Sequence, residues 1–391
     1  MKTIFTLLIF GLLASAVLAQ EAPTTNLTDA CVEIYDESVD YFPDKTEVEY
    51  AAGFEVEYFN NYKVINVLQP WRDADVTFTY VLVQCGTPAP EGYEDAAIIE
   101  VPIDTVVSMS TTYVPHFVEL GLLDHVVGVD EFDFIYNADM RELIETGEIV
   151  EVGGSSAVNV ELVLDLDPDL IMTFGLGSPD YDAHPVLLDA GLNVALNSDY
   201  METSPLGRAE WIKFTAMFFN READANAFFD GVAERYNELV AQVGEIEERP
   251  TVLVNGNYGD TWFVAGGASY TAQLIKDAGG DYLWADDDST GGLPLSFEAV
   301  LERGQDADYW INPNFWFSLA DGLAEDERYA EFEAFQNGNV YNNNARVNEF
   351  GGNDYLEGGV VNPDVLLADL VAIFHPELLP DHELFYYQQL Q

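Results

Sequence analysis

A long helical stretch, from about Ser204 to Glu248, constrains the fold more than any other feature, because strand and helix patterns alternate on both sides of it. Its apolar residues follow the three-and-four spacing of one helical face: Trp211, Phe214 and Phe218, then Phe228, Val232, Tyr236, Leu239, Val240 and Val243. Asn220 falls between the two series and is followed by Arg221 and Glu222, which predicts an N-cap and two successive helices. The second would be about 35 to 40 Å long at roughly 1.5 Å per residue. We expect this stretch to link two domains, although a surface crossover within one large domain is the alternative.

Short apolar strands alternate with helical runs on either side, which predicts two parallel-sheet α/β lobes. The strands expected in the first lobe are Thr105 to Met109, Val126 to Val129, Ile149 to Val152, Leu170 to Thr173 and Asn193 to Leu196. Those expected in the second are Thr251 to Val254, Thr261 to Val264, Asp308 to Ile311 and Val340 to Tyr341. We therefore divide the chain into lobes at 101–204 and 248–391, joined by linking helices at 205–247.

The N-terminal part of the chain has a different pattern. Met1 to Ala19 carries Lys2, an apolar run and a small-residue cleavage site, as a secretory signal peptide does, so we expect export. Residues 20–100 predict an N-terminal antiparallel β extension, because alternating β-branched segments are joined by short turns. Those segments are Phe54 to Phe59, Tyr62 to Leu68 and Thr77 to Gln84.

The charge balance is extreme, with 70 acidic against 14 basic residues and a formal net charge of −56. Such a chain would be repelled by nucleic acid and by an anionic membrane surface. Most of the acids are expected to form a solvated acidic surface. Each basic residue in a predicted loop is correspondingly more informative about what the protein binds.

Cysteine occurs only at Cys31 and Cys85, both in the N-terminal quarter of a chain that we expect to be exported. An oxidising compartment favours a disulfide between them. Two unrelated buried thiols are the alternative.

A faint internal repeat relates the two halves. Asn159 is followed two residues later by Glu161, a short helix and then Asp169 before a buried strand; Ser296, Glu298 and Asp308 repeat this order. A glutamate in a first helical turn complements the helix dipole, which is a sufficient explanation for one copy. Two copies in corresponding places indicate that the lobes are structurally related.

These segments resemble the substrate-binding proteins of ABC importers for iron-siderophore complexes, haem and cobalamin, in which one rigid helix joins two α/β lobes. The resemblance covers roughly Ile103 to Pro376. It is carried by VSMSTT at 107–112, GLLDHVVGV at 121–129, the NVE and DPDLI segments within 159–171, and the linking helix. It implies an exported monomer on the outer side of the cytoplasmic membrane that partners an ABC permease. The resemblance further implies that Glu161 and Glu298, one on each lobe, dock onto the permease.

A ligand should bind between the lobes, because ligands of open α/β sheets bind outside the carboxyl ends of the strands. Many of the side chains in those loops are aromatic, which suits a conjugated ligand such as an iron chelate, haem or cobalamin. The candidate ligand-binding residues are Ser110, Thr111, Thr112, Tyr136, Phe174, Tyr200, Arg208, Tyr258, Trp262, Trp316, Arg346 and Tyr355. Phe134 and Glu202 lie in the same loops. We expect about half of the aromatic residues to line the cleft and the others to be packing.

Arg208 and Arg346 are the bases nearest these loops and could bind an anionic group of the ligand, since a guanidinium donates bidentate hydrogen bonds. A salt bridge within its own helix turn is the alternative for Arg208. The five histidines are scattered without metal-site spacing, so we expect no direct metal site. His116 follows the first loop and is expected to be structural.

A competing class is a secreted hydrolase, such as a glycosidase that uses two carboxylates. No nucleophile motif or Gly-rich phosphate loop is present, and with 70 acids a carboxylate pair near any site is expected by chance. A sugar- or peptide-binding receptor without a transporter is a third possibility. Stoichiometric binding, as opposed to turnover, separates the binding proteins from the enzyme.

Overall fold

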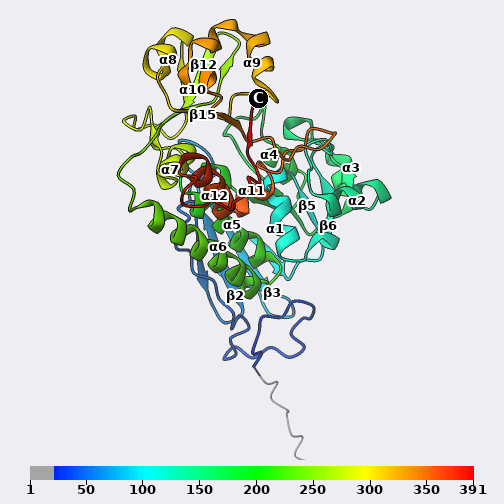
Figure 1. Ribbon diagram of the computed structural model, residues 1–391. Helices are drawn as coiled ribbons and strands as arrows, with labels where there is room; N and C mark the ends of the chain where they lie inside the picture. Colours follow the sequence, from blue (N-terminus) through cyan, green and yellow to red (C-terminus); the bar gives the residue numbers. More distant parts are fainter. Residues whose placement is uncertain (1–21) are drawn as a thin grey trace, which may run out of the picture.

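The computed structural model describes residues 22–391, so the expected signal peptide at 1–19 lies outside the described residues. Two α/β lobes and an N-terminal sheet surround a central pair of helices (Figure 1). Within residues 22–391, no helix combines the length and the apolar character needed to cross a membrane.

The N-terminal lobe is a five-stranded sheet, all parallel, in the order β7-β6-β5-β8-β9. Its strands are β5 (Val106–Ser108), β6 (Val126–Val129), β7 (Val150–Glu151), β8 (Leu170–Thr173) and β9 (Val194–Leu196). Its helices are η1 (Thr111–Tyr113), α1 (Val114–Glu119), η2 (Leu123–His125), α2 (Ala138–Thr146), η3 (Ser155–Ala157), α3 (Val160–Leu166), α4 (His184–Asp189) and η4 (Asp199–Met201). All five strands predicted for this lobe are confirmed, because short buried runs between helices are a strong local signal.

The C-terminal lobe contains a second five-stranded sheet, in the order β13-β10-β15-β16-β17, with only β17 antiparallel to its neighbour. Its strands are β10 (Thr251–Val254), β13 (Asp281–Tyr282), β15 (Tyr309–Ile311), β16 (Val340–Asn342) and β17 (Gln388–Gln389). Its helices are α7 (Tyr270–Asp277), α8 (Phe297–Gly304), α9 (Leu319–Glu325), η5 (Glu327–Glu331), α10 (Glu333–Asn337), α11 (Gly358–Val361) and α12 (Pro363–Phe374).

One strand prediction for this lobe placed its strand in the wrong sheet. Thr261 to Val264 does form a strand, β12 (Thr261–Ala265), but it lies in a separate antiparallel sheet between β11 (Asn257–Tyr258) and β14 (Gly292–Leu295). Only Gly259 and Asp260 connect β11 to β12. A connection of that length makes a hairpin, whereas a parallel pair needs a crossover of a dozen or more residues.

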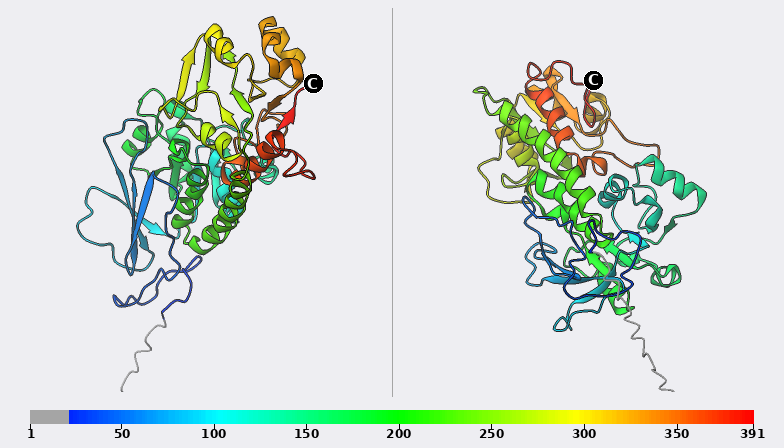
Figure 2. Two further views of the ribbon diagram at one scale, coloured as in Figure 1. Left: turned by 60° about the vertical axis from the view of Figure 1, so that its left-hand side comes forward. Right: turned by 90° about the horizontal axis from the view of Figure 1, so that it is seen from below.

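The central pair consists of α5 (Pro205–Phe218) and α6 (Glu222–Val243). All but one residue of α5 are buried. The helix ends close to the segment that precedes β5 of the N-terminal lobe, where Ile103 N–H donates a hydrogen bond to Phe218 O at 2.9 Å. After that point α6 returns past α5 and α12 toward the C-terminal lobe, the crossing that the green ribbon makes in Figure 2. At 22 residues, α6 spans about 33 Å and is the long helix that joins the lobes.

Asn220 is not the N-cap that its sequence context predicted. Arg221 occupies that position, and Asn220 adopts a left-handed backbone with φ of 55°. Asn tolerates this conformation better than most residues because its short amide can hydrogen-bond locally. Here that buried amide donates to Leu27 O and Gln84 Oε1, at 2.7 and 2.9 Å, and so ties the helix break to the N-terminal segment.

The N-terminal sheet consists of β1 (Phe54–Tyr58), β2 (Tyr62–Val67), β3 (Phe78–Gln84) and β4 (Ala97–Val101), paired in that order. Three of the strands were predicted as antiparallel neighbours, and they are. The fourth, β4, was not predicted, and it pairs with β3 in parallel. In Figure 2 this sheet stands beside the central helices.

Buried polar contacts fix the N-terminal segment to the core of the molecule. The Glu210 carboxylate accepts hydrogen bonds from three successive backbone N–H groups at residues 49–51, at 2.7 to 3.1 Å. Lys63 of β2 pairs with Glu222 of α6, and both side chains are fully buried. The predicted disulfide is confirmed, with Cys31 and Cys85 joined at a sulfur–sulfur distance of 2.19 Å. The N-terminal segment is therefore an integral part of the fold.

Candidate functional site

The cleft between the lobes holds two adjoining cavities that share Asn255 and Thr271. The larger, of about 720 Å³, we call the amide cavity. It is lined by Phe134, Asn255, Thr271, Asn312, Asn314, Phe315, Phe317, Asn343, Asn344, Val347, Gly351, Asn353, Tyr355 and Leu356. None of these side chains is charged, although the chain carries 70 acids. Three phenylalanines, 56% to 88% exposed, border the cavity and present apolar surface to a ligand.

The asparagines reach the amide cavity because they follow the strands of the C-terminal sheet. Asn255 comes directly after β10, Asn312 and Asn314 after β15, and Asn343 after β16. Asn255, Asn312 and Asn314 adopt left-handed backbone conformations, with φ of 60°, 58° and 45°. Among residues with side chains, Asn is one of the few that visits this conformation at low energetic cost. The sequence thus bends the chain sharply at the strand end and places an amide there.

One of these amides is incompletely bonded. Asn312 Oδ1 is buried and has no hydrogen-bond partner among residues 22–391. A buried acceptor without a partner costs about 1 to 3 kcal/mol. The hydroxyls of Tyr355 and Tyr387 lie close to the same Asn312 amide.

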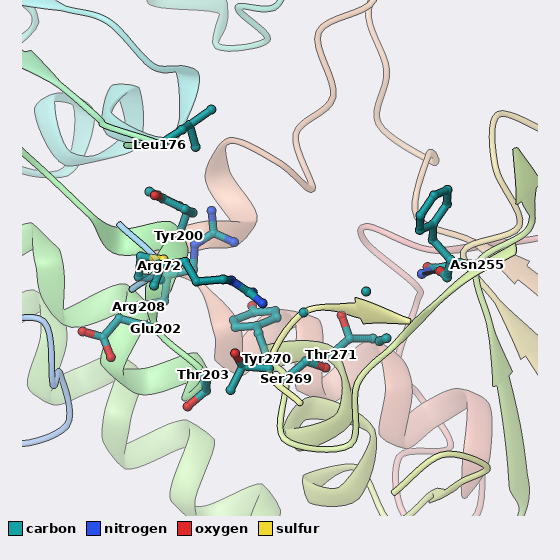
Figure 3. Close-up of a pocket in the computed structure, with 16 residues that line it drawn as sticks. Arg72, Leu176, Tyr200, Glu202, Thr203, Arg208, Asn255, Ser269, Tyr270 and Thr271 are labelled. Atoms are coloured by element: carbon teal, nitrogen blue, oxygen red, sulfur yellow. Dashed lines mark hydrogen bonds between the residues drawn. The ribbon is translucent and has the colours of Figure 1, made fainter. Parts of the chain in front are cut away.

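The second cavity, of about 500 Å³, lies between the lobes and we call it the arginine cavity (Figure 3). It is lined by Arg72, Leu176, Tyr200, Met201, Glu202, Thr203, Arg208, Asn255, Phe263, Ala265, Ser269, Tyr270, Thr271, Thr290, Gly291 and Gly292. Glu202 is 7% exposed, and its carboxylate accepts hydrogen bonds from the N–H groups of Ala52 and Gly53 and from Trp211 Nε1, the shortest at 2.8 Å.

Arg208 is held in place by an acid and a ring. Its Nε donates to Asp199 Oδ2 at 3.1 Å, and its guanidinium lies 5.6 Å from the centre of the Tyr270 ring. Burial acts to lower the pKa of Arg208, but the Asp199 carboxylate and the nearby Tyr270 and Tyr355 together outweigh it, and the pKa lies above its ordinary value. Asp199 belongs to η4, not to the helix turn of Arg208, so the salt bridge spans two elements.

Arg72 comes from the loop between β2 and β3 of the N-terminal sheet, and its side chain is exposed in the cavity. No carboxylate of the described residues lies within 4.0 Å of its nitrogens. Burial, followed by Asp182 and Asp199, raises the pKa of the Tyr200 phenol to about 12. Arg72 lies close enough to act in the opposite direction on this pKa. The cavity therefore contains one neutralised arginine and one without an acidic partner.

The lobes also meet beside the amide cavity. Glu357 precedes α11, is 2% exposed, and accepts hydrogen bonds from Tyr136 N–H and Asn137 N–H of the N-terminal lobe, both at 2.8 Å. The pKa of this carboxyl is raised to about 7, mainly by burial. The two N–H groups act to lower this pKa, and the nearby Asp354 acts to raise it. Asn348 Nδ2 donates to Ile135 O at 2.8 Å in the same contact. We call this contact the lobe latch.

Three of the predicted ligand residues line these cavities: Tyr200 and Arg208 the arginine cavity, and Tyr355 the amide cavity. Phe134 and Glu202, from the same predicted loops, line them too.

Ser110, Thr111 and Thr112 lie behind the arginine cavity, at the carboxyl end of β5. Ser110 Oγ contacts Thr112 Oγ1 at 3.0 Å, and Thr112 Oγ1 donates to Asp199 at 3.4 Å. Phe174 packs edge-on against Tyr200, with ring centres 6.3 Å apart. These residues support the wall rather than line it.

Tyr136, Tyr258 and Arg346 lie outside both cavities. Tyr136 lines a surface depression beside α2, and Tyr258 is 76% exposed at the tip of the β11–β12 hairpin. Arg346 Nε donates to Asp354 Oδ2 at 2.6 Å, and the guanidinium stacks over Phe385 at 4.1 Å. The guanidinium also lies 5.5 Å from the centre of the Tyr136 ring of the other lobe, and these contacts make Arg346 a structural residue.

The expectation that Trp262 and Trp316 bind ligand is corrected. Trp262 is fully buried, stacks on Trp310 with ring centres 5.3 Å apart, and donates from Nε1 to Val254 O. Trp316 is 3% exposed and donates from Nε1 to Glu325 Oε2 at 2.7 Å. Both belong to an aromatic cluster under the antiparallel sheet that the sequence pattern did not reveal.

His116 is structural, as expected. It is fully buried, its Nδ1 lies 2.7 Å from Thr215 Oγ1, and burial lowers its pKa to about 3. Within residues 22–391, no group of three or more His, Cys, Asp or Glu side chains is arranged to hold a metal ion.

The residues that the sequence interpretation missed are Arg72 and all six asparagines of the amide cavity. A signal for the asparagines was present, because NGN follows TVLV, NPN follows YWI and NNN follows VY. No local signal points to Arg72, since it reaches the cleft only through tertiary packing.

Two α/β lobes that face each other across a lined cleft define a two-lobed binding protein. The family model described as "Periplasmic binding protein" matches residues 106–347, and the chain belongs to this family. Its members are binding proteins, so the hydrolase alternative is not retained.

The chain is also similar to a curated protein and to solved structures. An uncharacterized lipoprotein of Methanocaldococcus jannaschii is 27% identical over 293 residues, which cover 72% of this chain and 67% of the relative. Among solved structures, a periplasmic binding protein from Veillonella parvula superposes with a TM-score of 0.57 at 16% identity, over 85% of this chain and 98% of the other. A periplasmic haem-binding protein from Pseudomonas aeruginosa gives 0.52 at 22% identity, over 70% and 93%. At these identities the structures show a shared fold.

Proposed function

We propose that this protein is the exported substrate-binding protein of an ABC importer, which captures a metal chelate between its lobes and delivers it to a membrane permease. The observation that carries the proposal is the amide cavity, which is large, aromatic and without charged side chains in a chain of net charge −56. A volume of about 720 Å³ lies within the roughly 300 to 1,000 Å³ typical of small-molecule sites.

The lining of the amide cavity favours a metal that is already bound in a chelate. Uncharged amides cannot neutralise a bare multivalent ion, and the cavity lining contains no carboxylate, thiolate or imidazole ligand. Asn side chains donate and accept hydrogen bonds, and phenylalanine faces cover flat or apolar surface. An iron–siderophore complex, haem or cobalamin presents both kinds of surface. The haem-binding protein from Pseudomonas aeruginosa shares the fold and is consistent with this class.

The first test is purification from the native source, followed by absorbance and mass spectrometry of the bound molecule. A chelate chromophore would support the proposal. A colourless sugar or peptide would favour the alternative of a receptor for such ligands, which the amide groups could also bind. Titration with ferric ion alone is the control, because capture of bare iron at similar affinity would contradict a site for chelates.

Delivery to a permease is proposed to use Glu161 and Glu298. Glu161 lies in the first turn of α3 after the N-cap Asn159, and Glu298 in the first turn of α8 after the N-cap Ser296. Both are exposed, and Glu298 forms a salt bridge with Arg328 at 3.3 Å. Charges placed equivalently on two lobes can steer association and fix its register.

The docking proposal is tested with the double variant Glu161→Ala, Glu298→Ala in uptake by the reconstituted importer. Uptake should fall while the affinity for the co-purified chelate stays constant, because neither residue lines a cavity. The double variant Glu145→Ala, Glu331→Ala, which removes one exposed glutamate per lobe elsewhere, is the matched control. Normal uptake by the first variant would contradict the docking role.

The domain limits at residues 100, 204 and 247 also stay a prediction.

A further inference from the structure

The loop at residues 68–77, between β2 and β3, is built to reach the ligand cleft. It lies outside residues 106–347, the part of the chain that matches the family. Ser198 Oγ donates to Pro70 O at 3.0 Å, and Ser198 is fully buried beside η4. Trp71 stacks on His184 with ring centres 5.6 Å apart. The two residues before Arg72 are thus fixed on the N-terminal lobe.

Two glycines of the N-terminal lobe make room for Trp71. A Cβ added at Gly175 would lie 2.8 Å from the Trp71 ring, and one added at Gly177 would lie 2.6 Å from it. Gly177 also has φ of 75°, a conformation that glycine adopts without strain. The surface of the lobe is therefore shaped to hold this indole.

Arg72 continues from this anchor to the opposite lobe. A Cβ added at Gly291, just before β14, would lie 2.6 Å from Arg72 Nη2 and 2.8 Å from Nη1. The guanidinium therefore rests against the backbone of the C-terminal lobe. Arg72 lines the arginine cavity together with Tyr200, Arg208 and Tyr270 (Figure 3).

The charge of Arg72 is unused inside the protein. In the described part of the chain, every Lys and Arg lies within 4.0 Å of a carboxylate except Arg72, Arg141, Arg249 and Lys276. Arg141 instead donates to Phe132 O at 2.6 Å, and Arg249 donates to Lys276 O at 3.2 Å. Of these four residues, only Arg72 lines one of the two cleft cavities.

We propose that the 68–77 loop is a third wall of the ligand cleft and that Arg72 binds an anionic oxygen group of the ligand, such as a carboxylate or a catecholate. This inference rests on the proposed function for its ligand class, and it adds a specificity-determining residue from outside the family domain. Arg208 shares the cavity, but Asp199 already neutralises it. Arg72 is therefore the residue that selects an anionic ligand over a neutral one of the same shape.

The test uses probes matched in shape and different in charge. Haemin and its dimethyl ester form one pair; a ferric tris-catecholate and a neutral ferric tris-hydroxamate form the other. Affinities are measured for the wild type, Arg72→Gln, Arg72→Lys and Arg249→Gln. The last variant removes the same charge from an exposed arginine outside the cleft and controls for the overall field. Melting curves show that each variant is folded.

We expect Arg72→Gln to weaken the anionic probe by about tenfold and the neutral one by less than about twofold, because only the charge-assisted bond is lost. Arg72→Lys should restore part of the difference, and Arg249→Gln should change neither affinity. Gly291→Ala should mimic Arg72→Gln, since its methyl group displaces the guanidinium. Equal losses for both members of a pair, or no loss for either, would overturn the assignment.

If the wild type binds no probe of either pair, the chelate proposal fails, and Arg72 is then judged with citrate alone. A rise in melting temperature with citrate that Arg72→Gln abolishes and Arg249→Gln retains would keep the anion site. An equal response of all three proteins would overturn it.

Discussion

Replacing Glu357 with glutamine should change the stability of the protein in a pH-dependent way. The carboxyl is buried in the lobe latch, and its pKa lies near 7 instead of the ordinary 4.5. Between these two values the unfolded chain releases the proton while the folded chain keeps it. The wild type therefore loses stability as the pH rises from 4.5 toward 7, whereas a glutamine at this position cannot lose a proton.

The size of the effect follows from the two pKa values. A shift of one pKa unit corresponds to about 1.4 kcal/mol, so ionising the buried carboxyl destabilises the wild type by about 3 kcal/mol at pH 8 and by less than about 1 kcal/mol at pH 5. Glutamine keeps one acceptor oxygen but turns an NH₂ toward one of the two backbone N–H groups, which costs about 1 to 3 kcal/mol at either pH. The free energy of unfolding of Glu357→Gln, taken relative to that of the wild type, should therefore be about 2 to 3 kcal/mol higher at pH 8 than at pH 5.

The measurement is urea unfolding of both proteins at pH 5 and pH 8, followed by tryptophan fluorescence. Taking the difference between variant and wild type at each pH cancels the contribution of the other acids. Glu327→Gln, at an exposed glutamate, is the control, and its difference should stay within about 0.5 kcal/mol. The reasoning would be refuted if the difference in unfolding free energy between Glu357→Gln and the wild type were the same at pH 5 and pH 8. Such a result would mean that the buried carboxyl ionises as it does in water.

Three further outcomes are expected. The lobes should move little when a chelate binds, because α6 and the lobe latch both join them, and a marked decrease in the radius of gyration from X-ray scattering would contradict this. Replacing Cys31 and Cys85 with serine should lower the free energy of unfolding by about 4 kcal/mol, the chain-entropy value for a separation of 54 residues, and a loss below about 1 kcal/mol would oppose it. Trp262→Ala should cost about 3 to 5 kcal/mol of stability without changing chelate affinity in the protein that remains folded; a selective loss of affinity would return Trp262 to the ligand site.

Local periodicity predicted the strands of the N-terminal lobe, the division of the helical stretch near Asn220, and β10, β15 and β16 of the C-terminal sheet. It did not predict β13 and β17, which have two residues each and are too short to show a period. The sheet to which β12 belongs could not be predicted, since a strand and its partner are indistinguishable from other alternating segments until the chain has folded. Trp262 was misassigned for the same reason. It lies within the predicted strand Thr261 to Val264, and the face of a strand that is covered is known only once its sheet has formed; here the Trp262 ring packs against Phe297 of α8.

The candidate site was predicted in its position more than in its chemistry. The rule that ligands bind at the carboxyl ends of strands located the cleft, and Tyr200, Arg208 and Tyr355 line it. The emphasis on aromatic residues overlooked the asparagines, whose role depends on several strand ends converging. Arg72 was beyond reach because Trp71 places it through a contact with α4 that no pattern in the N-terminal segment encodes.

The two lobes share a hydrogen-bonded triad at the amino ends of their strands, opposite the cleft. In the N-terminal lobe the Asp169 carboxylate accepts from Thr105 N–H at 2.9 Å and Asn193 Nδ2 donates to Asp169 O at 3.1 Å. In the C-terminal lobe the Asp308 carboxylate accepts from Thr251 N–H at 2.8 Å, and Asn339 Nδ2 donates to the backbone Asp308 O at 3.1 Å.

Each triad fixes the register of three adjacent strands from the end opposite the cleft. Recognition and scaffold are thus located at opposite ends of the same strands. A biosensor engineer could exchange the NGN or NPN loop for a sequence that accepts another chelate, and the triad of the C-terminal lobe would keep its strands aligned under the new surface.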